Sequence, residues 1–207
     1  MCGIAGFTGM LEARREIISR MMDRIVHRGP DMSGAYLGDG ITLGFRRLSI
    51  IDLSEAGRQP MTSEDGRYTV IFNGEIYNYR EIKAQLAFRG HTFHSESDTE
   101  VLLHAYMEYG RGMLDHLRGM FSFAVWDDAE HSLFCARDYF GIKPFYYYPM
   151  PDGGLIFGSE IKSFLEHPDF DKRLNPRSLR PYLTFQYSSE DETFFEGVYK
   201  LPPAHWL

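Results

Sequence analysis

The sequence predicts an α+β fold in which helices cover the outer faces of two stacked antiparallel sheets. Short apolar runs bounded by turn residues recur along the chain, and amphipathic helical patterns lie between the groups of strands. Around Phe121, Phe123 and Val125 the intervening residues are also uncharged, so both faces of that strand are expected to be buried. A sheet covered on both faces needs a layered architecture.

The amino-terminal half alternates predicted strands and helices. Residues 2–7 form an apolar run with glycines, which predicts a buried strand. Further strands are expected at 34–37, 41–45, 48–51 and 68–72. A helix is predicted over residues 11–26 because five apolar residues share one helical face: Ile17, Ile18, Met21, Met22 and Ile25. Asn78 with Glu81, and Ser97 with Glu100, resemble capping boxes that begin two more helices.

The carboxy-terminal half reads as short strands separated by turns. Strands are expected at 120–126, 132–136, 144–148 and 155–157, an antiparallel meander pattern. Helices are expected at 160–166 and 176–185. Lys143, just before Pro144, is expected to be a solvated turn residue or a contact to a partner domain. Arg137 and Asp138 are expected to form a structural ion pair.

The length and composition of the chain exclude several classes of protein. A chain of 207 residues suggests one domain that buries about 70% of its unfolded surface. The net charge of −7 argues against a nucleic-acid binder, and no apolar run is long enough for a membrane helix. The first residues lack the pattern of a signal peptide, and two cysteines suit a reducing compartment, so a cytoplasmic location is expected.

Cys2 is the first candidate for chemistry. Removal of Met1 would leave a cysteine with a free α-amine, whose ordinary pKa of about 7.7–8.0 lies close to that of a thiol. A nucleophile served by its own amine is a known mode of activation. The alternative is that Cys2 only begins a buried strand, and position alone favours this alternative.

Asn73 and Gly74 directly follow the strand predicted at 68–72. An Asn-Gly pair favours a turn, which is the preferred interpretation of the pair taken by itself. A side-chain amide and a neighbouring glycine N–H that point the same way would instead form an oxyanion hole.

Two further positions carry charges that need partners. Arg46 and Arg47 lie in an apolar stretch, where an arginine pairs with a protein carboxylate or with the α-carboxylate of a substrate. Asp98 lies at a helix start, where it either stabilises the helix or faces a substrate ammonium group. Together these residues would supply a nucleophile, an oxyanion hole, a cation for a carboxylate and an anion for an ammonium group. Such a site suits an α-amino acid with an acyl side chain, such as glutamine.

Along nearly the whole chain, the order of sequence motifs resembles that of one protein family. The motifs are MCGIAGF at 1–7, HRGPDMSG at 27–34, RRLSIIDL at 46–53, FNGEIYNYREI at 72–82, SDTE at 97–100, LRGMFSFAVWD at 117–127, ARDYFGIKPFYY at 136–147, FGSEIKSF at 157–164 and YKLPPAHWL at 199–207. They are similar to the glutaminase domain of asparagine synthetase (glutamine-hydrolysing), a class II glutamine amidotransferase domain.

The resemblance implies a four-layer α/β/β/α sandwich, the N-terminal nucleophile hydrolase fold. It implies that Cys2 attacks the carboxamide of glutamine and forms a thioester, while Asn73 and Gly74 hold the oxyanion. Arg47 matches the residue that pairs with the substrate α-carboxylate, and Glu75 and Asp98 match residues that hold its α-amino group. Further binding contacts come from four residues, partly through the backbone: Leu48, Ser49, Ile50 and Ile51. The motif from His27 to Asp31 is assigned a structural role.

The resemblance also sets expectations for partners. Residues 1–207 would be one amidotransferase domain, with a core over about 1–187 and a tail over 188–207 that leads towards a synthetase domain. That domain would use ATP and Mg²⁺ to make asparagine from aspartate; this chain lacks its SGG-x-D-S loop, so no cofactor is expected here. No metal site is expected, Cys135 is expected to be inert, and a homodimer is left open. Alternatives are a glutaminase domain with another acceptor, a non-catalytic glutamine-binding module, or a different amidase on the same scaffold.

Overall fold

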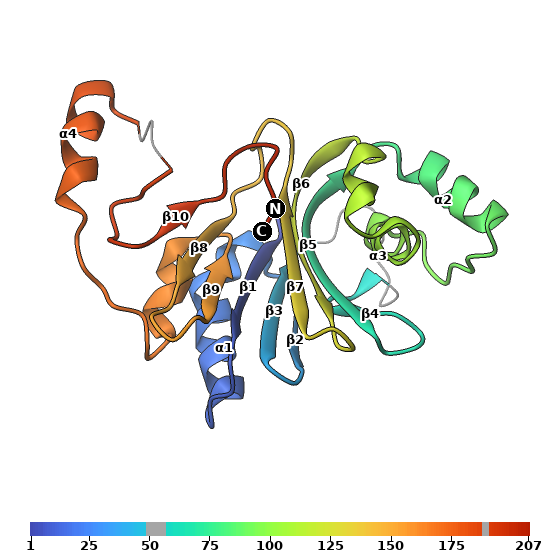
Figure 1. Cartoon of the computed structure of the whole chain (residues 1–207), viewed down its shortest axis with the longest axis horizontal. Helices are drawn as coiled ribbons and strands as arrows, with labels where there is room; N and C mark the ends of the chain where they lie inside the picture. Colours follow the sequence, from blue (N-terminus) through green and yellow to red (C-terminus); the bar gives the residue numbers. More distant parts are fainter. Residues whose placement is uncertain (49–56, 188–190) are drawn as a thin grey trace.

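Two antiparallel sheets stack at the centre of the computed structural model, which describes residues 1–48, 57–187 and 191–207 (Figure 1). Within these ranges, the first sheet has the strand order β10 (Tyr199–Lys200), β8 (Tyr146–Pro149), β9 (Leu155–Gly158), β1 (Gly3–Thr8), β3 (Ile41–Arg47), β2 (Met32–Leu37). The second has the order β4 (Met61–Thr62), β5 (Tyr68–Ile76), β6 (Gly119–Asp127), β7 (Ser132–Arg137). Neighbouring strands pair antiparallel throughout, as the sequence predicts.

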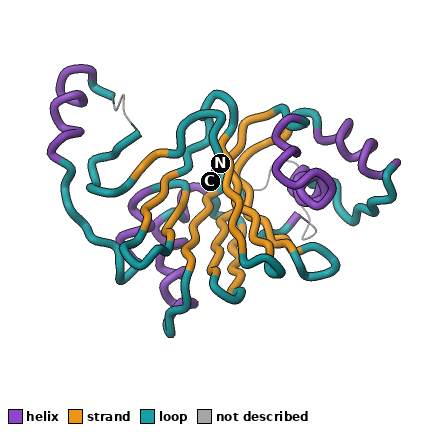
Figure 2. The backbone as a smooth tube through the Cα atoms, in the orientation of Figure 1, coloured by secondary structure: helices purple, strands orange, loops and turns teal. Residues whose placement is uncertain are grey.

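Helices cover the outer face of each sheet, which completes the four layers (Figure 2). α1 (Arg14–Arg24) and the 3-10 helix η4 (Ile161–Glu166) pack on the first sheet. α3 (Asp98–Tyr109) packs on the second sheet, with α2 (Tyr79–Phe88) against α3. The α+β sandwich expected from the sequence is therefore the observed architecture.

The interior between the sheets is apolar and aromatic. Strand alternation directs Ile4 of β1 into this layer, while Ala5 and Phe7 face the helices on the outside. The rings of Phe145 and Phe157 stack there with centroids 5.7 Å apart. Full burial of such a side chain stabilises the fold by roughly 2 kcal/mol, so this layer fixes the strands on which the site is built.

α1 is shorter than the helix predicted over 11–26. The N–H of Ile25 bonds back to the carbonyl of Met22, which tightens the chain into the 3-10 helix η1 (Val26–Arg28). Ile25 is still fully buried, because that last turn presents it to the core. At Gly44 an added Cβ would lie 2.7 Å from Ile18, so α1 approaches β3 more closely than any side chain on the strand would allow.

The predicted meander is wrong in one respect: β8 and β9 form a hairpin in the first sheet, whereas β6 and β7 belong to the second. Asp138 stabilises the segment in which the chain passes from the second sheet to the first. Its carboxylate accepts hydrogen bonds from the backbone N–H groups of Phe121, Phe140, Ile142 and Lys143. Arg137 is not held by Asp138 as expected; its guanidinium donates to the carbonyls of Gly141, Lys143 and Leu201.

The two predicted helix caps behave differently. Ser97 caps α3, accepting a hydrogen bond from the N–H of Thr99 at 3.1 Å. Asn78 precedes α2, but its side chain does not cap that helix; it bonds instead to the backbone of His116 and Arg118. The expected strand at 48–51 includes Leu48, which follows β3, and residues 49–51, which lie outside the described residues.

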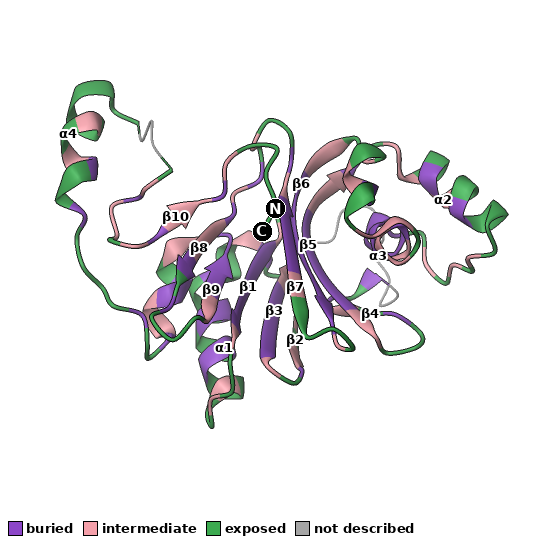
Figure 3. Ribbon diagram, viewed as in Figure 1, coloured by how far each residue is buried: buried purple, intermediate pink, exposed green. Residues whose placement is uncertain are grey.

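The carboxy-terminal residues return to the body of the molecule. β10 pairs with β8, and the N–H and carbonyl of Cys135 in β7 bond to the backbone of Leu207. The predicted helix over 176–185 is observed as α4 (Pro176–Phe185), and Figure 3 shows most of it exposed, at the periphery of the molecule. In the described part of the chain, none of the helices has the length and apolar character needed to cross a membrane.

Candidate active site

Cys2 lies just before β1, beside the end of β3. The β1–β3 register places Gly3 opposite Arg46, which brings Cys2 next to Leu48. The Leu48 N–H lies 3.4 Å from the Cys2 Sγ, and the sulfur lies 3.6 Å from the Leu48 carbonyl oxygen. Burial raises the pKa of the Cys2 thiol, and the Leu48 backbone, the amino terminus and Arg47 act to lower it.

Seven residues that the sequence singles out line one cavity: Cys2, Arg47, Leu48, Asn73, Gly74, Glu75 and Asp98. They come from the start of β1, the end of β3, the middle of β5 and the start of α3. The other three, Ser49, Ile50 and Ile51, lie outside the described residues.

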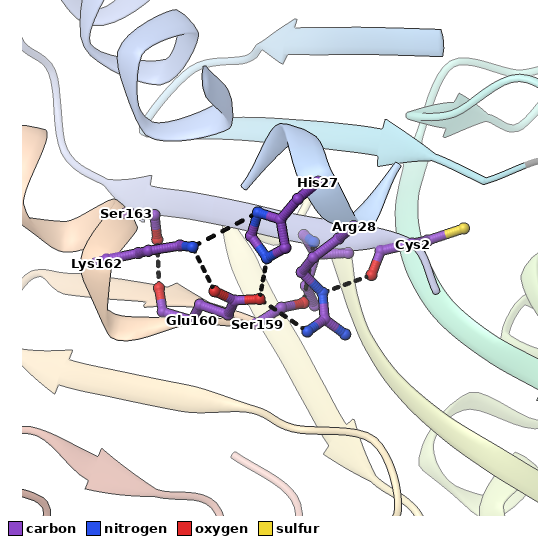
Figure 4. Close-up of polar contacts among 8 residues, drawn as sticks. Cys2, His27, Arg28, Ser159, Glu160, Lys162 and Ser163 are labelled. Atoms are coloured by element: carbon purple, nitrogen blue, oxygen red, sulfur yellow. Dashed lines mark hydrogen bonds and ion pairs between the residues drawn. The ribbon is translucent and has the colours of Figure 1, made fainter. Parts of the chain in front are cut away.

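The backbone of Cys2 is held by Arg28, from the HRGPD motif (Figure 4). The Arg28 Nε donates to the Cys2 carbonyl oxygen at 2.9 Å, and its Nη1 donates to Glu160 at 3.0 Å. Glu160 also contacts His27 and Lys162. Burial raises the pKa of Glu160, but hydrogen bonds from Arg28, Lys162 and His27 outweigh it and hold the pKa below its ordinary value. This cluster fixes the carbonyl of Cys2 and leaves the thiol directed away from it.

Asn73 presents an unused donor to the cavity. The side chain is 1% exposed, and its Nδ2 has no hydrogen-bond acceptor among the described residues. An amide left without a partner in a buried position destabilises the fold by about 1–3 kcal/mol. Such an arrangement suits a site where a bound molecule supplies the acceptor.

The N–H of Gly74 points away from the neighbouring strand β6. Phe121 of β6 directs both its N–H and its carbonyl towards Asp138, on the side away from β5. Gly74 stands opposite Phe121, so its own N–H points away from β6. Phe72 and Ile76, two residues to either side, point the same way and donate to the side chains of Gln59 and Asp98. The N–H of Gly74, which lies between Phe72 and Ile76 on this strand, has no acceptor among the described residues.

Only glycine fits at position 74. A Cβ there would lie 2.3 Å from the carbonyl oxygen of Met120 and 2.7 Å from the Cα of Phe121. The turn interpretation of Asn73-Gly74 is wrong, because both residues lie inside β5, which continues to Ile76. The pair therefore combines a side-chain amide and a backbone N–H at one edge of the cavity, the geometry of an oxyanion hole.

Arg46 and Arg47 have different surroundings, and the first interpretation, a structural ion pair, holds for Arg46. They alternate along β3, and Arg46 turns to Asp23 and the carbonyl of Met22 on the α1 side. Arg47 is buried and lines the cavity. One arginine thus forms the structural ion pair, while the other supplies a buried positive charge beside Cys2.

Glu75 and Asp98 place two carboxylates at the cavity wall. Asp98 accepts a hydrogen bond from the N–H of Ile76 at 3.0 Å. Burial raises the pKa of Asp98 from 3.8 to about 6, and the charge of Glu75 adds to this shift. Two carboxylates in the wall of one cavity favour a bound cation there.

The sequence does not mark several residues of the cavity wall as site residues, among them Gly57, Gln59, Met120 and Lys143. Gln59 bonds through its side chain to the N–H of Phe72 and to Thr99, and thereby ties β5 to α3. No local pattern marks Gln59, whose partners are distant in sequence. Lys143 is 5% exposed, so the expectation of a solvated turn is wrong. Cys135 is fully buried in β7, and burial raises the pKa of its thiol.

We searched the described residues for clusters of metal-ligating side chains. Within residues 1–48, 57–187 and 191–207, no group of three or more histidine, cysteine, aspartate or glutamate side chains could hold an ion. The chemistry described for the cavity uses a thiol, an amide, backbone N–H groups and charged side chains.

The whole chain, residues 1–207, matches the family described as glutamine amidotransferase domain. The chain belongs to this family. It is 42% identical to asparagine synthetase [glutamine-hydrolyzing] 3 of Bacillus subtilis, a match that covers 100% of this chain and 34% of the relative. It is 43% identical to asparagine synthetase [glutamine-hydrolyzing] 1 of the same organism, over 99% of this chain and 33% of the relative. This amidotransferase domain thus spans about a third of the length of these relatives.

Other similarities broaden the comparison. Amidase chry2 of Gibberella zeae is 39% identical over 100% of this chain and 32% of its own length. Among solved structures, glutamine phosphoribosylpyrophosphate amidotransferase from B. subtilis superposes with a TM-score of 0.70 at 21% identity, covering 84% of this chain and 46% of that one. At that identity the likeness shows the fold, and it agrees with the layered sandwich described above.

Proposed function

We propose that this amidotransferase domain hydrolyses glutamine to glutamate and ammonia, with Cys2 as the nucleophile. One observation carries the proposal: the Asn73 amide and the Gly74 N–H, both without acceptors in the described structure, line the same cavity as the Cys2 thiol. Membership in the glutamine amidotransferase family supplies the substrate class.

Activation requires removal of Met1. Met1 lines the cavity together with Cys2, so its removal frees the Cys2 α-amine and opens space at the thiol. The freed amine takes the thiol proton, and the thiolate attacks the carboxamide carbon. The oxyanion of the tetrahedral intermediate accepts hydrogen bonds from Asn73 Nδ2 and Gly74 N–H. The amine then returns its proton to the leaving nitrogen, ammonia departs, and water hydrolyses the γ-glutamyl thioester.

The charged side chains orient the substrate. Arg47 pairs with the α-carboxylate, for which a planar guanidinium fork is suited. Glu75 and Asp98 hold the α-ammonium group, and the Leu48 backbone contributes next to the thiol. Ser49, Ile50 and Ile51 are proposed to add contacts on the same side.

The ammonia is proposed to serve ATP-dependent asparagine synthesis in a longer protein, as the names of the B. subtilis relatives suggest. The partner would be a synthetase domain carboxy-terminal to residues 1–207, and ATP and Mg²⁺ would bind there. An apolar groove supports such a partner; its lining includes Tyr77, Leu117, Tyr139, Phe140, Ile142 and Trp206. Phe140 is 76% exposed, and exposed aromatic side chains gathered along one groove suit contact with another domain. A cytoplasmic location follows from this role; a homodimer remains an additional option.

A second candidate function differs only in the ammonia acceptor. The similarity to amidase chry2 extends over the whole chain, so the same domain occurs in a protein with a different name. The two candidates share the chemistry at Cys2 and differ in the remaining two thirds of the protein.

The test is ammonia release from the full-length protein with glutamine, compared with asparagine and simple amides. Cys2→Ala should abolish release while the protein stays folded, and an electrophilic glutamine analogue should label Cys2. Glutamine binding without turnover would identify a regulatory module instead. Faster turnover of another amide would identify a different amidase.

A further inference from the structure

Lys143 is a buried cation that the proposed mechanism does not use. It lines the cavity that contains Cys2, Asn73 and Glu75, although it is only 5% exposed. No hydrogen bond or ion pair of its ammonium group is found among the described residues. A buried charge without a partner lowers stability, so its position calls for a reason.

The backbone of Lys143 is held firmly on both sides. Its N–H donates to the Asp138 carboxylate at 2.9 Å, and its carbonyl accepts from Arg137 Nε at 2.8 Å. These bonds form where the chain crosses from the second sheet to the first. The hydrogen bond to Asp138 fixes the Lys143 backbone at the cavity wall. The side chain takes no part in these backbone hydrogen bonds.

The charges around Lys143 come from several elements. Burial and the cation of Arg28 lower the pKa of the Lys143 ammonium, whereas Cys2, Asp138 and Glu75 raise it. Arg47 and Asp98 line the same cavity, and Lys143 in turn lowers the pKa of the amino terminus. Of the anionic groups that act on Lys143, Asp138 is already bound to four backbone N–H groups. The Cys2 thiolate and Glu75 are the remaining anions for its charge.

We propose that the Lys143 ammonium stabilises the thiolate form of Cys2, as an electrostatic positioning residue for the nucleophile. Partial burial opposes ionisation of the Cys2 thiol, and a cation that lines the same cavity offsets this effect. The inference rests on the proposed role of Cys2, but it concerns the ionisation of the thiol and can be measured without glutamine turnover.

The experiment measures alkylation of Cys2 by iodoacetamide between pH 6 and 10 in the full-length protein with Met1 removed. Peptide mass spectrometry isolates the adduct at Cys2. Lys143→Met should raise the apparent pKa of the thiol by about half a unit or more, which slows alkylation at pH 7 by about threefold. Lys143→Arg, which keeps the charge, should restore the wild-type profile. Lys143→Gln provides a second neutral variant in case Lys143→Met does not fold.

A matched control is Lys83→Met, because Lys83 is partly buried on α2 and bonds to Ser95 and Glu96, away from the cavity. Its alkylation profile should equal that of the wild type. An unchanged profile in a folded neutral variant at Lys143 would overturn the inference and leave glutamine hydrolysis by Cys2 intact. Wild-type protein that hydrolyses glutamine after complete alkylation of Cys2 would instead overturn the proposed function.

Discussion

The Nε of Arg28 donates a hydrogen bond of 2.9 Å to the carbonyl oxygen of Cys2, so the residue that carries the thiol is held by a side chain from a different part of the fold. Arg28 is held in turn by Glu160, which follows β9. A nucleophile at a chain end has few backbone partners of its own. This pair replaces them and limits the positions that the thiol can adopt.

Glu160→Gln is therefore expected to reduce kcat. The neutral amide accepts a weaker hydrogen bond from Arg28, which lets the Cys2 carbonyl move and lowers the fraction of productive thiol positions. We expect a loss of about threefold to tenfold in kcat with little change in KM. Steady-state ammonia release measures both. Glu166→Gln is the control, because Glu166 on η4 pairs with Arg20 and Arg24 on α1 instead; equal kcat losses in both variants would contradict a specific role for Glu160.

Asn73→Ala should reduce kcat by about 10²–10³, the usual effect of removing one oxyanion donor. KM should change little, because this donor acts mainly as negative charge develops on the oxygen. Asn78→Ala is a matched control: Asn78 bonds to the His116 and Arg118 backbones outside the cavity. It should lower thermal stability without a comparable loss of kcat. A loss below about tenfold for Asn73→Ala would remove it from the oxyanion hole.

Arg47→Ala should raise KM strongly and kcat/KM should fall with it, because the α-carboxylate contact is made in both the ground state and the transition state. Arg46→Ala tests the specificity of this effect, since Arg46 pairs with Asp23 on α1. It should affect stability and leave KM near the wild-type value. Equal KM values for the two variants would show that Arg47 does not bind substrate.

Asp98 links substrate binding to pH and to stability. Its pKa of about 6 lies above the unfolded value of 3.8, so the native state binds more protons between these values and stability falls as pH rises through this window. Above about pH 6 the ionised carboxylate destabilises the fold by about 3 kcal/mol. Substrate binding has the opposite dependence, because only the ionised form attracts an ammonium group; KM should therefore rise as pH falls below about 6.

Asp98→Asn separates these two effects. The amide oxygen can still accept the hydrogen bond of Ile76, and no buried charge remains, so the melting temperature at pH 7 should rise by about 4 °C or more. KM for glutamine should rise at the same time. Thermal unfolding at pH 5 and pH 7 provides the control, since the gain should shrink at pH 5. A lower melting temperature at pH 7 would contradict the assignment of a raised pKa to Asp98.

Particular residues show how far the sequence determines this fold and site. The helical spacing of α1, the Ser97 cap and the period-two pattern of β6 follow from local physics, and the structure confirms them. Asn73-Gly74 was ambiguous, because its conformation depends on pairing with β6, which the local sequence does not specify. The transfer of β8 and β9 to the other sheet, and the burial of Lys143, depend on backbone contacts at Asp138 that join segments distant in sequence. Side chains that act through such contacts carry no local pattern.

The α-amine of Cys2 is the central element of the proposed chemistry, and blocking it tests the account most directly. One leucine inserted between Met1 and Cys2 would prevent exposure of that amine while leaving the thiol in the chain. Ammonia release from glutamine should then fall by at least about 10², within the range attributed to proton transfer by a positioned group. Release at the wild-type rate, from protein whose mass shows that the added residues are retained, would contradict the account.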